Sequence, residues 1–412
     1  MSNTESLSFP KDKIKVLLLE NVHQSAVNTF NEAGYQNVEH LTRALPEEEL
    51  IEKLKNAHLV GLRSKTQLTS EVLQHAEKLH AIAAFCIGTD QIDLEYAESQ
   101  GVPVFNSPTS STRSVAELVI GSTVHLLRGT FSKAYAIEQG RWEKSSSGSH
   151  EVRGKTLGII GYGRIGSQVS VLAEAMGMHV KFYDIAPKLA LGNAQPVDSL
   201  EALLGVADVV TLHVPRAPEN RYMIGEAQLK HMKQGAYLIN YARGEVIVGD
   251  DVARAIREGH LAGAAVDVYE AEPRKKGDAF EHVLRGLPNV ILTPHIGGST
   301  EEAQENIGVD AANKLIQFMD AGVTIGSHTV PELNLPPQQD THRLLHIHEN
   351  KPGMLSKINA GFSDLSVNIL SQYLKTNPRI GYVVMDIQRG QTDEALQFLK
   401  QIPGTIRVRS LY

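Results

Sequence analysis

Apolar and polar positions alternate in blocks along the first third of the chain. Short apolar runs, typical of buried strands, are separated by segments with the spacing of amphipathic helices. The predicted strands are residues 14–19, 59–63, 81–86 and 102–105, and the predicted helices are 46–56, 70–78 and 114–139. Because strands alternate with helices, we expect a parallel sheet covered on both faces.

A second series of the same kind follows the serine-rich loop at residues 145–149. Its predicted strands are residues 157–161, 180–184, 209–214, 237–240, 264–268 and 290–293, and a helix is predicted for 300–320. The pattern therefore predicts two doubly wound α/β domains. We expect the outer domain to be discontinuous, with residues 1–107 and 297–330, and the inner domain to span 108–296.

The end of the chain has a different pattern. Residues 331–340 are rich in proline and glutamine and are predicted to form a linker. In residues 341–412, the predicted strands are 344–348, 367–374, 382–387 and 405–410, and the predicted helices are 354–362 and 393–401. This βαββαβ order is ferredoxin-like. His342, His346 and His348 alternate along its first strand, and we expect an exposed polar face there rather than a metal site.

Composition and charge exclude several classes of protein. The formal net charge of −7 argues against a nucleic-acid binder, which needs a basic stripe. Cys86 is the single cysteine, so no intrachain disulfide forms and a reducing cytoplasm fits. The first residues lack the apolar core of a signal peptide, and the most apolar stretch, 115–127, is too short and too polar to span a bilayer. We therefore expect a cytoplasmic protein without nucleic-acid or membrane partners.

The glycine-rich run Gly161-Tyr-Gly-Arg-Ile-Gly166 is the strongest chemical signal in the chain. It joins a predicted buried strand to a helix, as in the Rossmann dinucleotide-binding unit. In that unit the first glycine permits a tight turn, and the second, here Gly163, lets the backbone approach a pyrophosphate. The third glycine lets the helix pack closely on the strand. The helix N-terminus, at Arg164 and Ile165, would hold the phosphates. Asp184 ends the next strand at about the 20-residue distance expected for a ribose contact, so the run predicts a nicotinamide cofactor and hydride transfer.

Three later strands end in polar residues suited to the oxidation of a 2-hydroxy acid. Because the carboxyl ends of parallel strands meet at one edge, Arg243, Glu272 and His295 are expected to share a crevice. A guanidinium can grip the substrate carboxylate in bidentate fashion. A histidine can take the hydroxyl proton, and a carboxylate behind it can fix its tautomer. Further candidate cofactor contacts at these strand ends are Ala242, Asp267 and Gly298.

Each of these residues also has an ordinary structural interpretation. Arg243 could cap a helix, and His295 could be a satisfied loop histidine. Glu272 and Asp184 could be turn residues, and Asp267 could be a helix-dipole partner. Their common position beside a dinucleotide motif favours the functional interpretation for the set.

These motifs together resemble the D-isomer-specific 2-hydroxyacid dehydrogenases. The motifs of the inner domain are the glycine run, Asn240-x-x-Arg243-Gly244, Asp267-Val-Tyr-x-x-Glu272-Pro273 and Pro294-His295-x-Gly297-Gly298. The resemblance is closest to members that act on 3-phosphoglycerate, through Gly61-Leu-Arg-Ser-Lys-Thr66, Phe85-Cys-Ile-Gly-Thr-Asp90, Asn106-Ser-Pro, Thr112-Arg-Ser-Val-Ala-Glu117 and Leu345-His-Ile-His-Glu-Asn-Lys-Pro-Gly353. It covers nearly the whole chain, and the tail, residues 341–412, resembles an ACT regulatory domain.

The resemblance implies NAD-dependent oxidation of 3-phospho-D-glycerate to 3-phosphohydroxypyruvate, the first step of serine biosynthesis. It implies that Arg63, Ser64, Lys65 and Gly88 bind the substrate, and the two cations suit its phosphate. Lys144 resembles a lysine that a neighbouring subunit contributes. Ordinary surface charge is the alternative for these cations, and for Lys144 it is about as well supported.

The resemblance also implies a homotetramer that serine inhibits through the tail. The effector would lie between two such domains, with His348 and Asn350 facing Asn368 of the partner chain. Capping and turn roles are the alternative for these residues. The linker reads Pro336-Pro-Gln-Gln-Asp340 where a family member that this chain resembles has a flexible glycine pair, which leaves the mode of domain movement open.

Two other functions stay open from the sequence. The first is a dehydrogenase for another 2-hydroxy acid, such as 2-hydroxyglutarate, because Arg243 recognises the carboxylate but not the far end of the substrate. The second is a dinucleotide-sensing corepressor, since some corepressors share this fold. The phosphate-matched cations and the ACT-like tail favour the enzyme.

Overall fold

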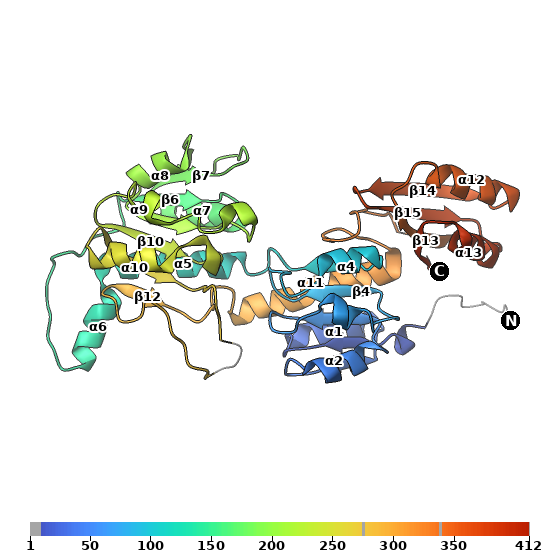
Figure 1. Ribbon diagram of the computed structural model, residues 1–412, viewed down its shortest axis with the longest axis horizontal. Helices are drawn as coiled ribbons and strands as arrows, with labels where there is room; N and C mark the ends of the chain where they lie inside the picture. The colour runs from blue at the N-terminus through green and yellow to red at the C-terminus, as the bar shows by residue number, and fades with distance from the viewer. Residues whose placement is uncertain (1–9, 274–276, 338–339, 412) are drawn as a thin grey trace. The chain divides into compact units, whose positions relative to one another are not determined.

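The computed structural model describes residues 10–273, 277–337 and 340–411 (Figure 1). It divides into two compact units, Met1–Ser110 with Gln304–Tyr412, and Ser111–Ala303. Gln338 and Gln339 of the predicted linker lie outside the described residues. No helix in the described ranges combines the length and the apolar character needed to cross a membrane.

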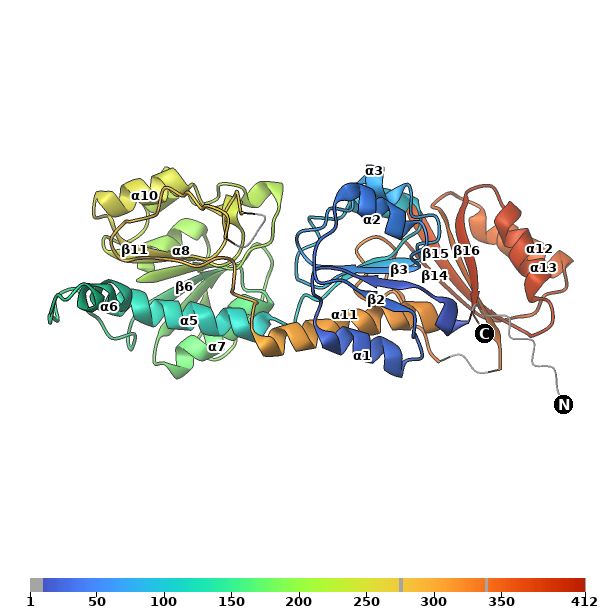
Figure 2. The ribbon, with the colours of Figure 1, turned by 90° about the horizontal axis from the view of Figure 1, so that it is seen from below.

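The N-terminal part of the first unit is a parallel sheet in the order β2-β1-β3-β4-β5. Its strands in that order are Val38–His40, Val16–Leu18, Leu59–Leu62, Ala81–Ala84 and Val104–Asn106. One face packs on α1 (Gln24–Glu32) and α11 (Glu301–Ala321). The other face packs on α2 (Glu47–Leu54), α3 (Ser70–Leu73) and α4 (Leu94–Ser99) (Figure 2). The predicted covering of both faces is confirmed, whereas sequence analysis missed α1, α4 and β2.

The second unit is a parallel sheet in the order β12-β11-β10-β9-β6-β7-β8. Its strands in that order are Val290–Leu292, Leu261–Val266, Ala236–Asn240, Val209–Leu212, Thr156–Ile160, His179–Tyr183 and Gln195–Pro196. Helices α5 (Thr112–Arg128) and α7 (Arg164–Ala175) cover one face. Helices α8 (Leu200–Val206), α9 (Glu226–Leu229) and α10 (Gly249–Arg257) cover the other (Figure 2). The chain reverses direction across the sheet between β6 and β9, which is where such sheets bind ligands.

The single long helix expected over residues 114–139 is wrong. Helix α5 ends at Arg128, and α6 covers Thr130–Glu138. Gly129 between them has a φ of 58°, in the left-handed region that ends a helix and that glycine adopts without strain. In Figure 1, α6 and the segment after it extend away from the body of the second unit.

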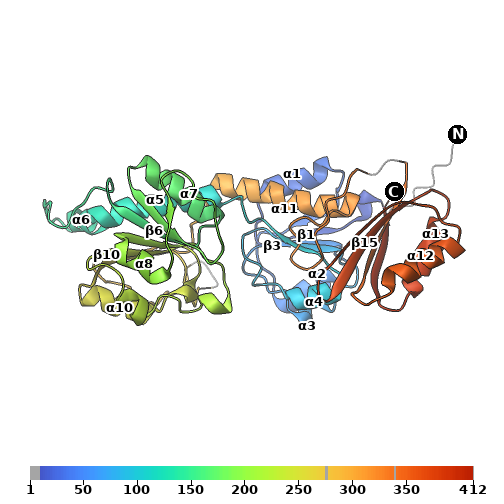
Figure 3. The same ribbon diagram turned by 90° about the horizontal axis from the view of Figure 1, so that it is seen from above.

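The tail is a four-stranded antiparallel sheet in the order β14-β15-β13-β16. The strands are Ile369–Thr376, Ile380–Ile387, His342–Glu349 and Thr405–Leu411 in that order. Helices α12 (Met354–Asp364) and α13 (Thr392–Gln401) lie on one face (Figure 3). The predicted βαββαβ order is confirmed. The expected exposed histidine face is wrong, because His346 and His348 point to the helix side of the sheet, as Leu344 does, and are 0% and 3% exposed.

The opposite face of the tail sheet packs on the N-terminal part of the first unit. Leu345 and Ile347 of β13 share an apolar cluster with Val330 and Leu335. Arg343, fully buried, donates from Nε and Nη2 to the Asp386 carboxylate at 2.7 and 2.9 Å and from Nη1 to the Ala321 carbonyl at 3.0 Å. The tail is therefore part of the same compact unit as the N-terminal sheet.

Candidate active site

The glycine-rich run after β6 has the backbone geometry of a dinucleotide turn. Gly161 has a φ of 88°, and a Cβ there would lie 2.6 Å from the His213 carbonyl oxygen. A Cβ on Gly166 would lie 2.2 Å from the Gly161 oxygen, so α7 approaches the strand closely. A Cβ on Gly163 would meet nothing within 4 Å, so its backbone is open to a ligand. The residues present therefore fit a bound dinucleotide.

The N-terminus of α7 lies directly after this turn. The helix begins at Arg164 with Gly163 as its N-cap. Its first amides, which include those of Arg164 and Ile165, have no acceptor within the helix and suit a pyrophosphate. Asp184 follows β7 and accepts from the Tyr162 amide at 2.8 Å and from the Ala186 amide at 2.9 Å. These two hydrogen bonds fix the predicted ribose carboxylate beside the glycine loop.

The loop after β10 is closed by a buried asparagine. Asn240 Oδ1 accepts from the Ala242 amide at 3.1 Å, and Asn240 Nδ2 donates to the Arg243 carbonyl at 2.9 Å. The Arg243 guanidinium donates back to the Ala242 carbonyl at 2.8 Å. Because the backbone on both sides of Arg243 is held in this way, its guanidinium leaves the sheet edge from a defined position.

The structure brings Glu272 and His295 together. The Nδ1 atom of His295 lies 2.9 Å from both carboxylate oxygens of Glu272. The Glu272 hydrogen bond raises the pKa of His295 above its ordinary value, although burial opposes this. Burial would raise the pKa of Glu272, yet the contact with His295 leaves that pKa lowered. The pair therefore favours an ionised carboxylate that directs the other ring nitrogen, Nε2, away from itself.

Arg243, Glu272 and His295 follow three neighbouring strands, β10, β11 and β12. The positive charge of Arg243 acts on both members of the pair, since it lowers the pKa of Glu272 and opposes the rise in the pKa of His295. The His295 side chain is 50% exposed. A guanidinium and an accessible imidazole thus lie at one sheet edge, as the oxidation of a hydroxy acid requires.

Asp267 holds the loop that carries His295. Its Oδ1 accepts from the Thr293 hydroxyl at 2.6 Å and from the Ile296 amide at 2.8 Å, and its Oδ2 accepts from the Gly297 amide at 2.7 Å. Burial raises the pKa of this carboxyl, and the hydrogen bonds oppose that effect. His295 itself has a φ of 53°, which is unusual for a residue with a side chain. The cofactor contact predicted for Asp267 stays a prediction, and these hydrogen bonds add a positioning role for its carboxylate. Gly298, the last predicted cofactor contact, follows in the same loop beside Ser111.

The predicted substrate residues Arg63, Ser64, Lys65 and Gly88 belong to the first unit. They follow β3 and β4, which are adjacent strands, at the carboxyl edge of the sheet. A residue that sequence analysis missed organises this edge: buried Glu20 accepts from the Lys65 amide at 2.9 Å and from the Thr66 amide at 2.7 Å. An acid directly after the apolar run of β1 was the signal for it.

Lys144 and the predicted effector residues lie elsewhere. Lys144 is exposed in the segment after α6. His348 is buried, and its Nδ1 pairs with the Glu349 carbonyl at 2.7 Å. Asn350 is exposed and donates to the Asn377 carbonyl at 2.8 Å, while Asn368 is exposed at the start of β14. Within the described ranges, no cluster of three or more histidine, cysteine or acidic side chains could hold a metal ion.

Sequence analysis also missed His213 beside the glycine run. It follows β9, and its Nε2 lies 3.0 Å from the Thr211 hydroxyl. Burial lowers its pKa to about 3, so the ring is neutral at physiological pH. The ring therefore adds no charge beside the glycine run, and a lone histidine inside the predicted strand 209–214 gave no signal for this.

Comparison with known proteins agrees with this geometry. Residues 120–297 match the model of the D-isomer specific 2-hydroxyacid dehydrogenase NAD binding domain, and residues 344–407 match the AHAS small subunit-like ACT domain. The D-3-phosphoglycerate dehydrogenase of Haemophilus influenzae is 52% identical over 409 residues, which cover 99% of this chain and 100% of its own. This chain belongs to the D-isomer specific 2-hydroxyacid dehydrogenases.

Other relatives of this dehydrogenase extend the comparison. The D-3-phosphoglycerate dehydrogenase of Escherichia coli K12 is 51% identical, over 98% of this chain and 99% of its own. The D-lactate dehydrogenase of Aquifex aeolicus, solved with NAD and lactic acid, is 30% identical. It has a TM-score of 0.66 and covers 77% of this chain and 100% of its own. The dehydrogenase is thus an NAD-dependent oxidoreductase, and the cofactor predicted from the glycine run is confirmed.

Proposed function

We propose that the enzyme oxidises 3-phospho-D-glycerate to 3-phosphohydroxypyruvate, with Arg243, Glu272 and His295 as the reacting machinery. The observation that carries the proposal is the Glu272–His295 pair, with Nδ1 2.9 Å from the carboxylate, beside a dinucleotide turn. The near full-length relatives named D-3-phosphoglycerate dehydrogenase support this choice of substrate.

In this proposal each residue of the site has a separate role in the reaction. NAD held by the glycine turn and Asp184 would supply the acceptor for the hydride that leaves the substrate carbon. Arg243 binds the substrate carboxylate and polarises the forming carbonyl. His295 Nε2 takes the hydroxyl proton, and Glu272 stabilises the imidazolium that results. Because this pairing raises the pKa of His295, the protonated ring is also well suited to return the proton in the reverse direction.

Recognition of the phosphate end is proposed for the first unit. Arg63 and Lys65 follow β3, and their loop is held by Glu20 through the amides of Lys65 and Thr66. A phosphate needs concentrated positive charge, which these two side chains supply. In this proposal they distinguish phosphoglycerate from 2-hydroxyglutarate, whose far end carries a carboxylate instead.

The test is steady-state kinetics on a substrate panel with NAD. We expect His295→Ala to lower kcat by about 10²–10⁴ with a modest change in KM, since general-base catalysis contributes that much. Arg243→Ala should lower kcat and also raise KM for the acid. Exposed His150 provides the matched control as His150→Ala. Near-wild-type turnover by His295→Ala, or a preference for 2-hydroxyglutarate, would contradict the proposal.

We further propose that serine regulates the enzyme through an assembly in which two tails meet. His348 and Asn368 were both assigned to the effector, yet they lie toward opposite ends of the sheet. His348 pairs with Gly381, and Ile369, next to Asn368, pairs with Ile387 at the other end of β15. At about 3.3 Å per residue, the six residues from Gly381 to Ile387 span roughly 20 Å. One chain therefore cannot bring both residues to one serine, which supports a site completed by the partner chain.

Exposed apolar side chains on α6, on the segment after it and on edge strand β14 support the same assembly. Phe131 and Trp142, in and after α6, are 53% and 81% exposed, and Leu370 on edge strand β14 is 53% exposed. Surfaces of this kind commonly mark contacts between subunits. Lys144, two residues after Trp142, would then reach a neighbouring subunit. The tetrameric state and the cytoplasmic location stay predictions.

Activity measured against serine concentration tests this regulation. We expect Asn350→Ala and Asn368→Ala each to raise the half-inhibiting serine concentration by about tenfold, the loss expected for one or two hydrogen bonds. Asn359→Ala, an exposed asparagine on α12, is the matched control and should leave inhibition unchanged. Wild-type enzyme that ignores millimolar serine would contradict the regulatory role and leave the catalytic proposal intact.

A further inference from the structure

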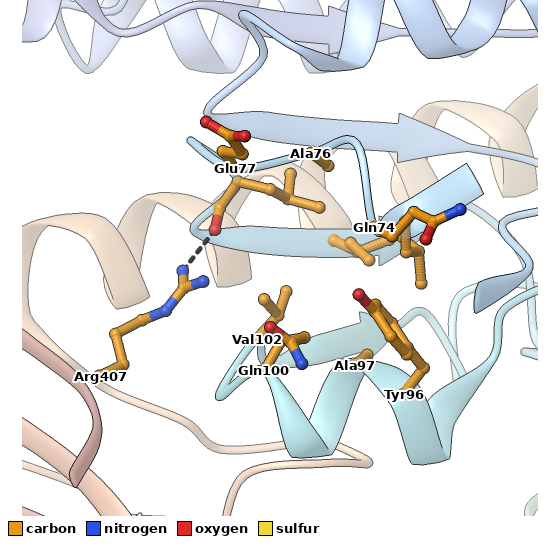
Figure 4. Close-up of a pocket in the computed structure, with 11 residues that line it drawn as sticks. Gln74, Ala76, Glu77, Tyr96, Ala97, Gln100, Val102 and Arg407 are labelled. Atoms are coloured by element: carbon orange, nitrogen blue, oxygen red, sulfur yellow. Dashed lines mark hydrogen bonds between the residues drawn. The ribbon is translucent and has the colours of Figure 1, made fainter. Parts of the chain in front are cut away.

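A small pocket lies where strand β16 of the tail meets helices α3 and α4 of the N-terminal part of the same unit (Figure 4). It has a volume of about 120 Å³. A cavity of about 150 Å³ can hold a benzene-sized molecule, so this pocket has room for a ligand of roughly that size. It is separate from the glycine turn, from the Glu272–His295 pair and from His348.

Arg407 of β16 supplies the one positive charge among the residues that line the pocket. Its guanidinium donates to the Leu79 carbonyl, as the dashed line in Figure 4 marks. In the described part of the chain, this is the only hydrogen bond of its side chain, and it forms no ion pair. Burial alone lowers the pKa of Arg407, since no carboxylate raises it.

The guanidinium of Arg407 is partly buried, and the described residues use only one of its five donors. The fully buried Arg343 of the same sheet is satisfied by a bidentate carboxylate, Asp386, at 2.7 and 2.9 Å. Arg407 has no such partner, and its free donors border a cavity instead of packed protein. The contrast indicates that the carboxylate for Arg407 comes from outside the chain.

The other residues that line the pocket indicate the chemical character of the rest of the ligand. Leu73, Leu79, Ala97 and Val102 are buried apolar residues that border the cavity. The Tyr96 hydroxyl points into the pocket from α4 and offers a second donor (Figure 4). Exposed Glu77 also lines the pocket, and its negative charge disfavours a doubly charged anion such as phosphate.

We propose that this pocket binds a small monocarboxylate with a short aliphatic body, held by Arg407 and Tyr96. The carboxylate accepts from the guanidinium and from the phenol, and the aliphatic body lies against Leu79 and Val102. Because the walls come from both β16 and the N-terminal helices, the ligand bridges the tail and the N-terminal part of the unit. Binding therefore strengthens their contact.

The experiment is titration of the intact enzyme with butyrate, followed by calorimetry and by the shift in Tm. We expect saturable binding in the millimolar range, because a ligand of six heavy atoms gains little free energy beyond the cost of association. Because Arg63 and Lys65 are proposed to bind phosphate elsewhere, phosphate is tested as a competitor. At the same ionic strength it should displace bound butyrate only at concentrations at least about tenfold higher than butyrate itself needs, since it is doubly charged beside Glu77. Phosphate that displaces butyrate as readily as butyrate binds, or butyrate that does not saturate, would overturn the proposal.

Three variants locate the site. Arg407→Met should weaken butyrate binding by at least about tenfold, and Tyr96→Phe by a few-fold, as expected for losing a charged and a neutral donor. Arg409→Met is the matched control. Arg409 is a partly buried arginine on the same strand that donates to the Met319 carbonyl at 2.5 Å but does not line the pocket. The assignment of the butyrate site to this pocket is wrong if Arg409→Met weakens butyrate binding as much as Arg407→Met does, or if Tyr96→Phe leaves that binding unchanged. The Tyr96→Phe result decides the matter even if Arg407→Met folds poorly.

Discussion

The contacts of Asp267 make a specific prediction for the variant Asp267→Asn. The carboxylate accepts three hydrogen bonds, from the Thr293 hydroxyl and from the amides of Ile296 and Gly297, at 2.6–2.8 Å. Asparagine has the same shape but keeps only one accepting oxygen. Its NH₂ group would face a backbone amide, so one donor in the loop around His295 loses its acceptor.

The size of the effect follows from these bonds. A hydrogen bond to a charged group stabilises by about 1.5–3 kcal/mol and a neutral one by about 0.5–1.5 kcal/mol. The variant removes one charged bond and makes the other two neutral, while it relieves the burial of a carboxylate that is 1% exposed. We expect a net loss of about 2 kcal/mol in the stability of the loop that carries His295, or roughly a 30-fold fall in its active population.

The assay is steady-state kinetics with NAD varied at saturating acid, together with thermal unfolding. We expect kcat to fall by roughly 30-fold and KM for NAD to change little, because the loop is displaced and not the cofactor site. Asp208→Asn is the control. Asp208 accepts from the Thr156 amide at 2.8 Å at the start of β6, the opposite edge of the same sheet. An unchanged kcat with a raised KM for NAD would contradict the positioning role and would favour a direct contact between Asp267 and the cofactor.

Three further variants test other parts of the structure. Glu272→Gln removes the negative charge that, together with the hydrogen bond, raises the pKa of the catalytic histidine, so that pKa falls. The kcat/KM for oxidation, which needs the neutral ring, should then decline only at a lower pH on acidification. Gly166→Ala places a Cβ 2.2 Å from a backbone oxygen, so NAD affinity and Tm should both fall, whereas Gly205→Ala in α8, with 3.9 Å of room, should leave Tm unchanged or raised. Arg343→Met leaves a buried carboxylate unpaired and should lower the free energy of unfolding, measured in urea, by about 3–5 kcal/mol.

The spacing of apolar residues along the chain was enough to predict much of the fold. Long apolar runs such as Val209–Leu212 and Ala236–Asn240 are buried along their whole length, as strands of a doubly covered sheet must be. The short strand Val38–His40 is only half-buried at a sheet edge and lacks that signal. The break at Gly129 was missed because a single glycine inside a helical pattern can be tolerated within the helix or can end it.

For the site, the sequence predicted which residues share an edge but not what holds them there. Strand ends placed Glu272 and His295 together, since their strands are neighbours in the sheet. The hydrogen bonds of Glu20 and Asp267 join segments far apart in the chain, so a local pattern such as an acid after an apolar run can mark the residue but not its partners. His346 and His348 were wrongly expected at a surface, because the alternation of residues along a strand does not show which face of the sheet is covered.

The packing of the tail sheet on the N-terminal part of the unit affects how regulation can be studied. A chain shortened before residue 341 would expose the apolar side chains of Val330 and Leu335 and leave the carbonyls of Leu79 and Met319 without their arginine donors. Such a surface favours self-association. If the shortened enzyme did not respond to serine, the cause could then be aggregation or the missing effector site, and the experiment would not separate the two. Point substitutions at Asn350 and Asn368 avoid this ambiguity, since both side chains are exposed.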